Sequence, residues 1–366
     1  LPYRKNKNKN LISLKNNLKK INNRIIKKLI DSCNNRCIVV PLSAGLDSRF
    51  ILSGLVHMGY KNIRTFSYGR EHNREKKVAK EIAEYLNIPW KFIKFNNLNQ
   101  KKIMLSKNYK KFKEFSDVAT SVHFPQDFQA IEYLKLNNYI PKNSIFVNGQ
   151  TGDFISGNHI QITDNKTSIN QILDSYIQKH YKIWKSLLLE NRKKMRKILE
   201  DRVYSYKKSK KSNYFILEAL QKIEYEDRQA KYLMAGQRNY EYLGFEWRLP
   251  LWDKEYIDFW GSLAFKFRIR QNLYKTVLEE QNWCNVWNKF PLNPKNSFSK
   301  EINLARLIFK CLFLVSGRAN WHKFELKFLD YFMSPLCGYA PWPYSKIISD
   351  KRGFASALSW HIEEYL

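Results

Sequence analysis

The chain has 366 residues, 44% of them hydrophobic, so it can bury one large core or two moderate ones, as an ordinary soluble protein does. Its formal charge of +31 comes mostly from Lys spread along the chain among Asn and Ile, which indicates a compositional bias and leaves nucleic-acid binding as a minority interpretation. The cysteines form no CxxC pair or zinc-type spacing, residues 307–315 are too short an apolar run for a membrane span, and no signal peptide heads the chain, so we expect a cytoplasmic protein.

The first predicted elements form a strand–turn–helix unit behind a lead-in helix. Residues 11–29 place Leu and Ile at helical spacing among Lys and Asn. Residues 37–42 are a short apolar run rich in β-branched side chains, which predicts a strand. The strand ends at the small-residue turn Ser43-Ala-Gly-Leu-Asp-Ser48, and an apolar stripe over residues 50–58 predicts a helix that ends near Gly59.

The same unit then repeats. Residues 63–68 and 90–95 predict further strands, separated by a helix over residues 79–86, and residues 144–147 predict a fourth strand after a mostly helical stretch. Strands that alternate with helices imply a parallel sheet with right-handed crossovers. The expected fold class is therefore α/β.

From residue 167 onward the periodicity is helical, and we predict no further strands. The expected division is a lead-in helix at 1–30, an α/β core at 31–165, a helical region at 166–300 and an aromatic-rich helical extension at 301–366. Because the first residue is Leu1 and not Met, we expect a fragment of a longer protein.

Two polar turns, after the first and the fourth predicted strand, are the candidate site. Ligands of open parallel sheets bind beyond the carboxyl ends of the strands. Small residues let backbone N–H groups approach a phosphate, the following helix N-terminus favours an anion, and Asp47 can hold a magnesium ion. The alternative is an ordinary turn in which Asp47 and Ser48 only cap a helix.

The first turn resembles a known phosphate loop. The chain has neither GxxxxGK[ST] nor GxGxxG, which argues against a Walker-type NTPase and a dinucleotide fold. Pro41-Leu-Ser-Ala-Gly-Leu-Asp-Ser48 is instead similar to the PP-loop of the ATP pyrophosphatases, Ser-Gly-Gly-x-Asp-Ser, with Ala44 at the second position. An alanine fits there only if the backbone does not need a positive φ. The resemblance implies a sheet of the adenine-nucleotide-α-hydrolase type.

Within that superfamily, the order of motifs resembles the synthetase domain of asparagine synthetase over residues 25–298. Phe66-Ser-Tyr-Gly69 resembles the second strand, and Asn148-Gly-Gln-Thr-Gly-Asp-Phe154 lies where the family carries Ser-Gly-Glu-Gly-Ser-Asp-Glu. Gly244-Phe-Glu-Trp-Arg-Leu-Pro-Leu-Trp-Asp253 is similar to Gly-x-Glu-x-Arg-x-Pro-x-x-Asp. The resemblance also extends to proteins of bacterial surface-polysaccharide biosynthesis.

The resemblance implies the following site. Residues for ATP and its pyrophosphate are Leu42, Ser43, Ala44, Gly45, Leu46, Asp47, Ser48, Tyr68, Gly149 and Asp153, with Asp47 and Asp153 as magnesium ligands. The family's cation on the leaving pyrophosphate falls on Lys289, with Lys295 as second choice and a surface lysine as the alternative for both.

Three further sets of residues belong to the candidate site. The family's carboxylate that handles ammonia is Gln150 here, which can orient a nucleophile but cannot act as a general base near neutral pH. Glu246, Arg248 and Asp253 either position the acceptor or tie the helical region to the sheet. His159 is the histidine nearest the second turn.

The implied function is an ATP-dependent, AMP- and pyrophosphate-forming amide ligase with ATP and Mg²⁺ as cofactors. Its acceptor would be aspartate or a sugar acid, and its nitrogen would come from ammonia or from a glutaminase domain or subunit that the chain does not contain. The alternatives are a PP-loop enzyme that modifies tRNA, for which the positive charge would be useful but no catalytic CxxC is present, and a non-catalytic ATP-binding relative.

Overall fold

The computed structural model describes residues 10–117, 121–123, 125–161, 167–206, 213–294, 297–313 and 315–365. Within these, five parallel strands form one sheet in the order β3-β2-β1-β4-β5. Their bounds are β1 Ile38–Pro41, β2 Ile63–Gly69, β3 Trp90–Lys94, β4 Ile145–Val147 and β5 Glu246–Arg248. The four predicted strands and the α/β class are confirmed.

The fifth strand contradicts our prediction that no strand lies beyond residue 167. β5 pairs in parallel with β4, with Ile145 opposite Glu246 and Val147 opposite Arg248. Its three residues, Glu-Trp-Arg, are too short and too polar to show a strand pattern on their own. Pairing with a buried neighbour strand decides their conformation. The sheet therefore takes its last strand from beyond the predicted boundary at residue 165.

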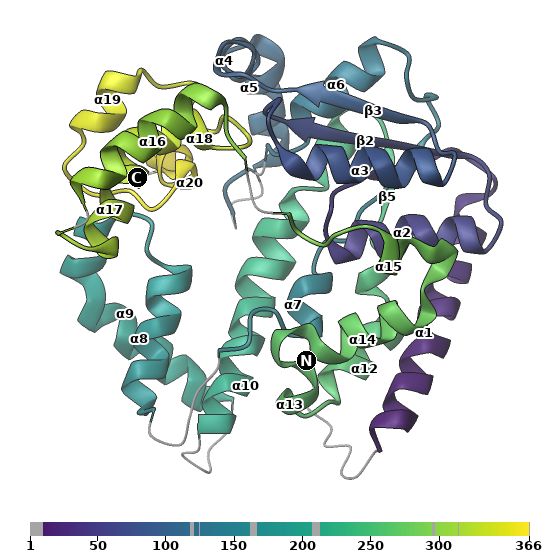
Figure 1. Ribbon diagram of the computed structural model, residues 1–366. Coiled ribbons are helices and arrows are strands. Elements are labelled where there is room, and N and C mark those ends of the chain that lie inside the picture. Colours follow the sequence, from purple (N-terminus) through teal and green to yellow (C-terminus); the bar gives the residue numbers. More distant parts are fainter. Residues whose placement is uncertain are drawn as a thin grey trace.

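Alternate residues of the central strands enter different cores, as expected of a sheet covered on both faces. Ile38, Val40, Ile145 and Val147 belong to one buried cluster, and Val39 and Phe146 belong to the other. Figure 1 shows the helices in two layers around the sheet. The first cluster is covered by α1 Leu11–Cys33, α2 Leu46–His57, α3 Arg74–Tyr85, α12 Lys254–Gly261 and α14 Asn272–Gln281. The second is covered by α4 Asn97–Met104, α5 Lys107–Ser116, α6 Phe128–Leu136 and α11 Arg238–Tyr242.

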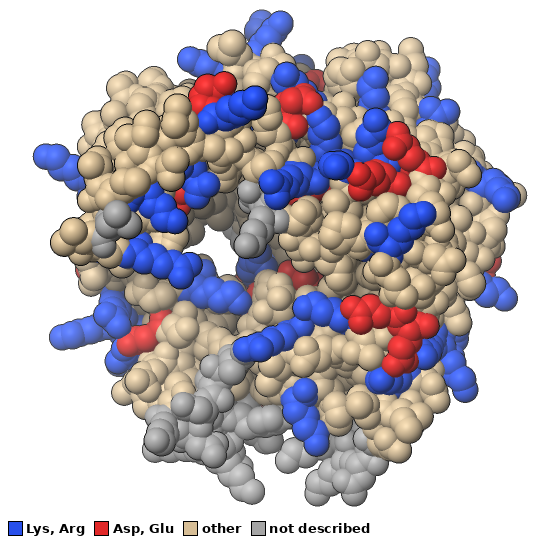
Figure 2. Space-filling model, viewed as in Figure 1, with Lys and Arg blue, Asp and Glu red and all other residues tan. Residues whose placement is uncertain are grey.

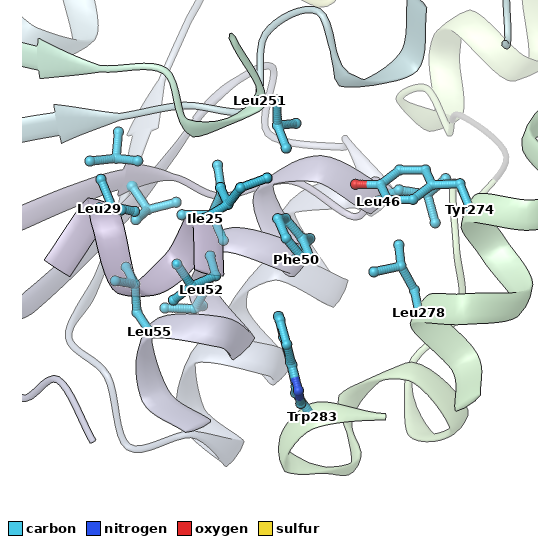
Figure 3. Packing of buried hydrophobic residues seen from close by; sticks show 14 of the residues in the cluster. Ile25, Leu29, Leu46, Phe50, Leu52, Leu55, Leu251, Tyr274, Leu278 and Trp283 are labelled. Carbon is cyan, nitrogen blue, oxygen red and sulfur yellow. The ribbon is translucent and has the colours of Figure 1, made fainter. Parts of the chain in front are cut away.

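The helix α2 is the centre of the first core. Figure 3 shows Phe50, Leu52 and Leu55 of α2 packed between Ile25 and Leu29 of α1 and the side chains of Tyr274, Leu278 and Trp283. The ring of Phe50 stacks on Trp283 at 5.4 Å between centroids. Because both flanking helices press on α2, its N-terminus and the loop before it are held in one position.

Two further groups of helices complete the chain. One has its own buried cluster and consists of α8 Ile169–His180, α9 Lys185–Ser205 and α10 Asn213–Glu224. The other forms a lobe at the upper left of Figure 1, with α16 Lys300–Leu312, α17 Arg318–Phe324, α18 Asp330–Met333, α19 Tyr344–Ser349 and α20 Ala357–Ile362. The short helices α7 Gly152–Ser156, α13 Phe265–Arg268 and α15 Val286–Lys289 lie in the connections.

The surface charge follows the sequence expectation on the face shown in Figure 2, where Lys and Arg are scattered among Asp and Glu. In the part of the chain that the structure describes, no helix combines the length and the apolarity that a bilayer crossing requires.

Candidate functional site

The loop between β1 and α2 is the first half of the site. The Ser43 amide donates to Ser48 Oγ (3.0 Å), the two serine hydroxyls lie 3.1 Å apart, and the Gly45 amide donates to Ser43 Oγ (3.2 Å). No side chain caps α2 at Gly45, so the first N–H groups of this 12-residue helix lack a side-chain acceptor. Ala44 has no positive φ, which meets the condition set for alanine in this loop. The loop therefore has the donors and the dipole that a phosphate needs.

The loop after β4 is the second half, and it lies against the first. A Cβ added to Gly149 would lie 2.4 Å from Asp47 Cβ, and one added to Gly152 would lie 2.5 Å from Asp47 Oδ1. Both distances are far below van der Waals contact. At Gly149 the new Cβ would meet the Cβ and backbone of Asp47, so a loop would have to move, whereas at Gly152 it would meet the side chains of Leu251 and Asp47. β1 and β4 are neighbours at the point where the strand order reverses, which is where open α/β sheets bind ligands.

Asp47 is the carboxylate on which both loops converge. Tyr274 donates its hydroxyl to Asp47 Oδ1 (2.9 Å), and the backbone N–H of Asp153 also bonds to this carboxylate. Burial, together with the nearby charge of Asp153, raises the pKa of Asp47 to about 8. With this raised pKa and no cation beside it, the carboxyl is mostly protonated at neutral pH.

Asp153 is held by a second set of charges. Its Oδ2 lies 3.1 Å from His159 Nε2, and His159 Nδ1 bonds to the buried Glu224. Burial acts to raise the pKa of Asp153, but the hydrogen bond and charge of His159 outweigh it, and the pKa is lowered. Burial likewise acts to lower the pKa of His159, yet its two carboxylate partners raise it to about 8. The carboxylate of Asp153 is 45% exposed and faces His159.

A cavity of about 430 Å³ opens beside these loops. Eight of the ten predicted ATP residues line it, namely Leu42, Ser43, Gly45, Leu46, Asp47, Ser48, Tyr68 and Gly149, and Gln150 lines it as well. Ala44 and Asp153 do not line it: Ala44 is buried and its carbonyl accepts from Arg49 and Asn293. Asp47 can thus hold a metal ion from the cavity, whereas Asp153 would first have to turn from His159.

No cluster of three or more His, Cys, Asp or Glu side chains has a metal-binding arrangement within the described residues. Among the two predicted magnesium ligands, Asp47 is the one that lines the cavity, and a cation there would need phosphate oxygens or water to complete its shell. This is the usual arrangement for magnesium, which keeps few protein ligands.

The far end of the cavity is built from a buried polar network. Tyr68 and Tyr240 both donate their hydroxyls to Asp127, and Gln126 donates to Tyr68 (3.0 Å). Burial raises the pKa of Asp127. Asn148 extends the network, because its amide lies 3.3 Å from the Tyr240 hydroxyl. The network fixes the ring of Tyr68, which lines the predicted nucleoside end.

Gln150 lines the cavity from the second loop. Its amide oxygen accepts a hydrogen bond from Gln237, and Gln237 also accepts from Asn148 (3.2 Å). With its oxygen engaged, the Gln150 amide has its N–H groups left to donate. This fits a side chain that orients a substrate oxygen and cannot remove a proton.

The structure describes one of the two lysines predicted to hold the pyrophosphate. Lys289 does not line the cavity: its ammonium lies 3.9 Å from the ring centroid of Tyr85, on the outside of α15. Lys295 lies outside the described residues. A cation that the sequence reasoning missed, Lys76 of α3, does line the cavity. The sequence signal for it was its place between the second predicted strand and the helix predicted over residues 79–86.

Glu246, Arg248 and Asp253 are not brought into the cavity. Glu246 pairs with Arg36 and Arg248, and these two cations lower its pKa to about 2. It lies opposite Ile145, at the amino end of β4 and so at the opposite end of the sheet from the cavity. Asp253 caps α12 and pairs with Lys28 of α1 (3.0 Å). Their contacts fit the second interpretation, that of ties between the helical region and the sheet.

Arg49 is a further residue that the sequence reasoning missed. It is fully buried and donates to the backbone oxygens of Ala44 (3.2 Å), Phe290 (2.9 Å) and Pro291 (2.8 Å). Its guanidinium therefore fastens the first loop to the segment after α15. Nothing in the local sequence distinguishes this arginine from a surface one.

The comparisons with known proteins bear on the first part of this site. Residues 37–143 match the family model described as "Queuosine biosynthesis protein QueC". The match supports assigning this segment to the PP-loop ATP pyrophosphatase superfamily. A stretch of 64 residues is 34% identical to the 7-cyano-7-deazaguanine synthase of Pseudoalteromonas translucida (strain TAC 125) and covers 17% of this chain and 29% of that protein. These matches support the superfamily and ATP use, and they do not support the asparagine synthetase branch in particular.

Proposed function

We propose that this chain activates a carboxylate by adenylation with ATP. The single observation that carries the proposal is the packing of Gly149 and Gly152 on Asp47, which joins the two loops into one phosphate-binding wall beside the cavity. The uncapped N-terminus of α2, Ser43 and Ser48 supply the donors on this wall. Adenylation releases pyrophosphate, and its concentrated negative charge is what such a wall stabilises.

In the proposed reaction, a carboxylate oxygen forms a bond to the α-phosphorus of ATP. The bond from that phosphorus to the oxygen shared with the β-phosphorus breaks, and pyrophosphate leaves with the electron pair. An amine or ammonia then attacks the acyl carbon, AMP departs, and a proton passes to solvent. Ser43, Ser48 and Lys76 hold the pyrophosphate, and Gln150 orients a substrate oxygen. A magnesium ion held by Asp47 would offset the phosphate charge, and Asp153 would join it only after turning from His159.

The class of acceptor is the finer part of the proposal. The comparisons favour an enzyme of the tRNA-modification type over asparagine synthesis, because the matched family is described as a queuosine biosynthesis protein. The second candidate is an amide ligase acting on aspartate or a sugar acid. It is supported by the loop Asn148–Phe154, which lies beyond the matched segment and contacts Asp47. In both cases ammonia, or a glutaminase domain or subunit, is the nitrogen source.

Pyrophosphate release tests the proposal. The purified chain is given Mg-ATP with a panel of amino acids, uronic acids and heterocyclic carboxylic acids, with and without ammonium. We expect release with at least one acid and its loss in Asp47→Asn. Asp253→Asn is the matched control, since this aspartate only caps α12 and pairs with Lys28. Undiminished release in Asp47→Asn would contradict the mechanism, and ATP binding without release would favour a non-catalytic relative.

A second measurement separates an acceptor within tRNA from a small-molecule acceptor. Filter binding of tRNA across a salt series reports whether the positive charge serves a nucleic acid, because true binding weakens steeply as salt rises. Salt-dependent tRNA binding favours the tRNA-modification candidate acting on the nucleic acid itself. Its absence, with release driven by a free acid, favours a small-molecule acceptor.

A further inference from the structure

The outer side of α16 carries apolar side chains that are open to solvent. Leu304, Leu307, Ile308 and Leu312 are 59%, 63%, 56% and 71% exposed, and no residue of this helix is fully buried. Their spacing, at i, i+3, i+4 and i+8, places them on one side of the helix, and we call these four side chains the α16 face. Single exposed leucines are common on protein surfaces, but a contiguous apolar set is typical of a surface that a partner covers.

The opposite side of α16 holds the helix on the C-terminal lobe. The ring of Phe309 lies 5.2 Å from that of Phe324 in α17, and Arg306 donates to Glu325 (2.7 Å). The guanidinium of Arg306 also lies over the ring of Phe298, 4.8 Å from its centroid. A surface helix normally turns its apolar side to the core and its polar side to water. These contacts hold α16 without the α16 face, which is left for a partner.

Positively charged side chains lie beside the α16 face. Lys300 begins the helix and Lys310 lies on its flank, while Arg318 and Lys323 belong to α17, which packs against α16; all four are exposed. Residues 300–325 hold five Lys or Arg against two Glu. In Figure 2 the C-terminal lobe, at the upper left, is mostly tan with blue side chains around it. The face therefore fits a partner that offers an apolar layer bordered by negative charge.

We propose that the α16 face docks the protein on the surface of an anionic lipid bilayer. The helix lies flat in the interface, with its four apolar side chains among the acyl chains and its lysines among the headgroups. A helix with an apolar side and flanking cations binds in this way, because a bilayer carries an apolar layer beneath a negatively charged one. This docking goes beyond the proposed adenylation and does not depend on it.

A second copy of the chain fits the α16 face less well. In a symmetric dimer the same patch meets itself, which would bring Lys300 and Lys310 of one copy close to the same lysines of the other. Like charges at such a distance repel one another. A stable dimer also takes about 800 Å² from each copy, more than four side chains of one helix supply. The bilayer meets both the apolar and the charged requirement.

Vesicle co-sedimentation tests the docking. The whole chain is mixed with vesicles of phosphatidylcholine, alone or with an equal amount of phosphatidylglycerol. Because the formal charge of +31 can draw the chain to anionic vesicles by itself, variants measure the apolar contribution. Leu307→Gln with Ile308→Gln should weaken binding to anionic vesicles at least about tenfold. Leu98→Gln with Leu136→Gln is the matched control and should bind like the parent chain, since these leucines of α4 and α6 are 81% and 74% exposed and lie on other helices.

A fluorescent label on Cys311 reports whether the α16 face enters the lipid. Cys311 is exposed and lies seven residues after Leu304, on the same side of the helix. Cys284→Ser removes the half-buried thiol, and the three remaining cysteines are buried, so a polarity-sensitive dye attaches at Cys311. We expect a blue shift and brighter emission with anionic vesicles. The same dye on Leu136→Cys, with Cys311→Ser, should keep the emission that it has in water.

Three results would overturn the docking. If the dye on Cys311 stays in water while the chain sediments, or if Leu307→Gln with Ile308→Gln binds as tightly as the control, charge alone draws the chain to the vesicles. If the chain binds neither kind of vesicle, or if light scattering shows a dimer that the same variant separates, a protein covers the α16 face and not a bilayer. Circular dichroism of each variant shows that the fold is intact.

Discussion

Replacing Gly149 by alanine tests the contact between the two loops directly. The new Cβ would lie 2.4 Å from Asp47 Cβ and 3.0 Å from its carbonyl carbon, against about 3.4 Å for ordinary contact. Because the opposing atoms are at the root of Asp47 and in its backbone, no side-chain rotation relieves the clash. The loops must separate by about 1 Å, a misplacement that can cost a site on the order of 100-fold in activity. Overpacking should also lower the free energy of unfolding by about 1–3 kcal/mol.

The assay is Mg-ATP affinity by equilibrium dialysis, measured beside thermal unfolding. Gly59→Ala serves as the control, because Gly59 has a φ of 79° with open space around it and lies at the other end of α2. That variant should lose about 1 kcal/mol of stability through its left-handed backbone, with unchanged ATP affinity. If folded Gly149→Ala binds Mg-ATP as tightly as the parent chain, the two loops do not act as one wall and the reasoning is refuted.

Three further predictions follow from the site. The pKa of Asp47 is raised to about 8, so below that pH the carboxyl must lose a proton before it binds a cation. Calorimetry in buffers of different ionisation enthalpy should therefore detect ~0.9 proton released per Mg-ATP bound at pH 7. The affinity for Mg-ATP should rise with pH up to about 8 and then level off. A pH-independent affinity would rule out Asp47 as the ligand. Lys76→Ala should weaken Mg-ATP binding about tenfold in equilibrium dialysis, and Lys289→Ala should not. The reverse result would support Lys289 as the lysine that binds the pyrophosphate. Arg49→Met should lower the free energy of unfolding in urea by about 3 kcal/mol, because it removes the arginine donors of the Phe290 and Pro291 carbonyls. A loss below ~1 kcal/mol would show that these contacts are dispensable.

Local patterns in the sequence determined the α/β class, four strands and the loop around Asp47. Apolar runs such as residues 37–42 and small-residue turns carry their signal within a few neighbouring positions, so a strand, a turn and a helix can be predicted there. The parallel order of the strands then brings Ser43 and Gly149 to the same edge of the sheet.

Tertiary structure decided what surrounds that loop. The hydroxyl on Asp47 comes from Tyr274, 227 residues away, and the lysine in the cavity is Lys76 and not Lys289. β5 is a strand only because β4 pairs with it, and a second cavity exists because Phe332 and its neighbours fold back over the ends of β2 and β3. Such contacts depend on which distant segments pack together, and the local periodicity of the sequence does not record which segments meet.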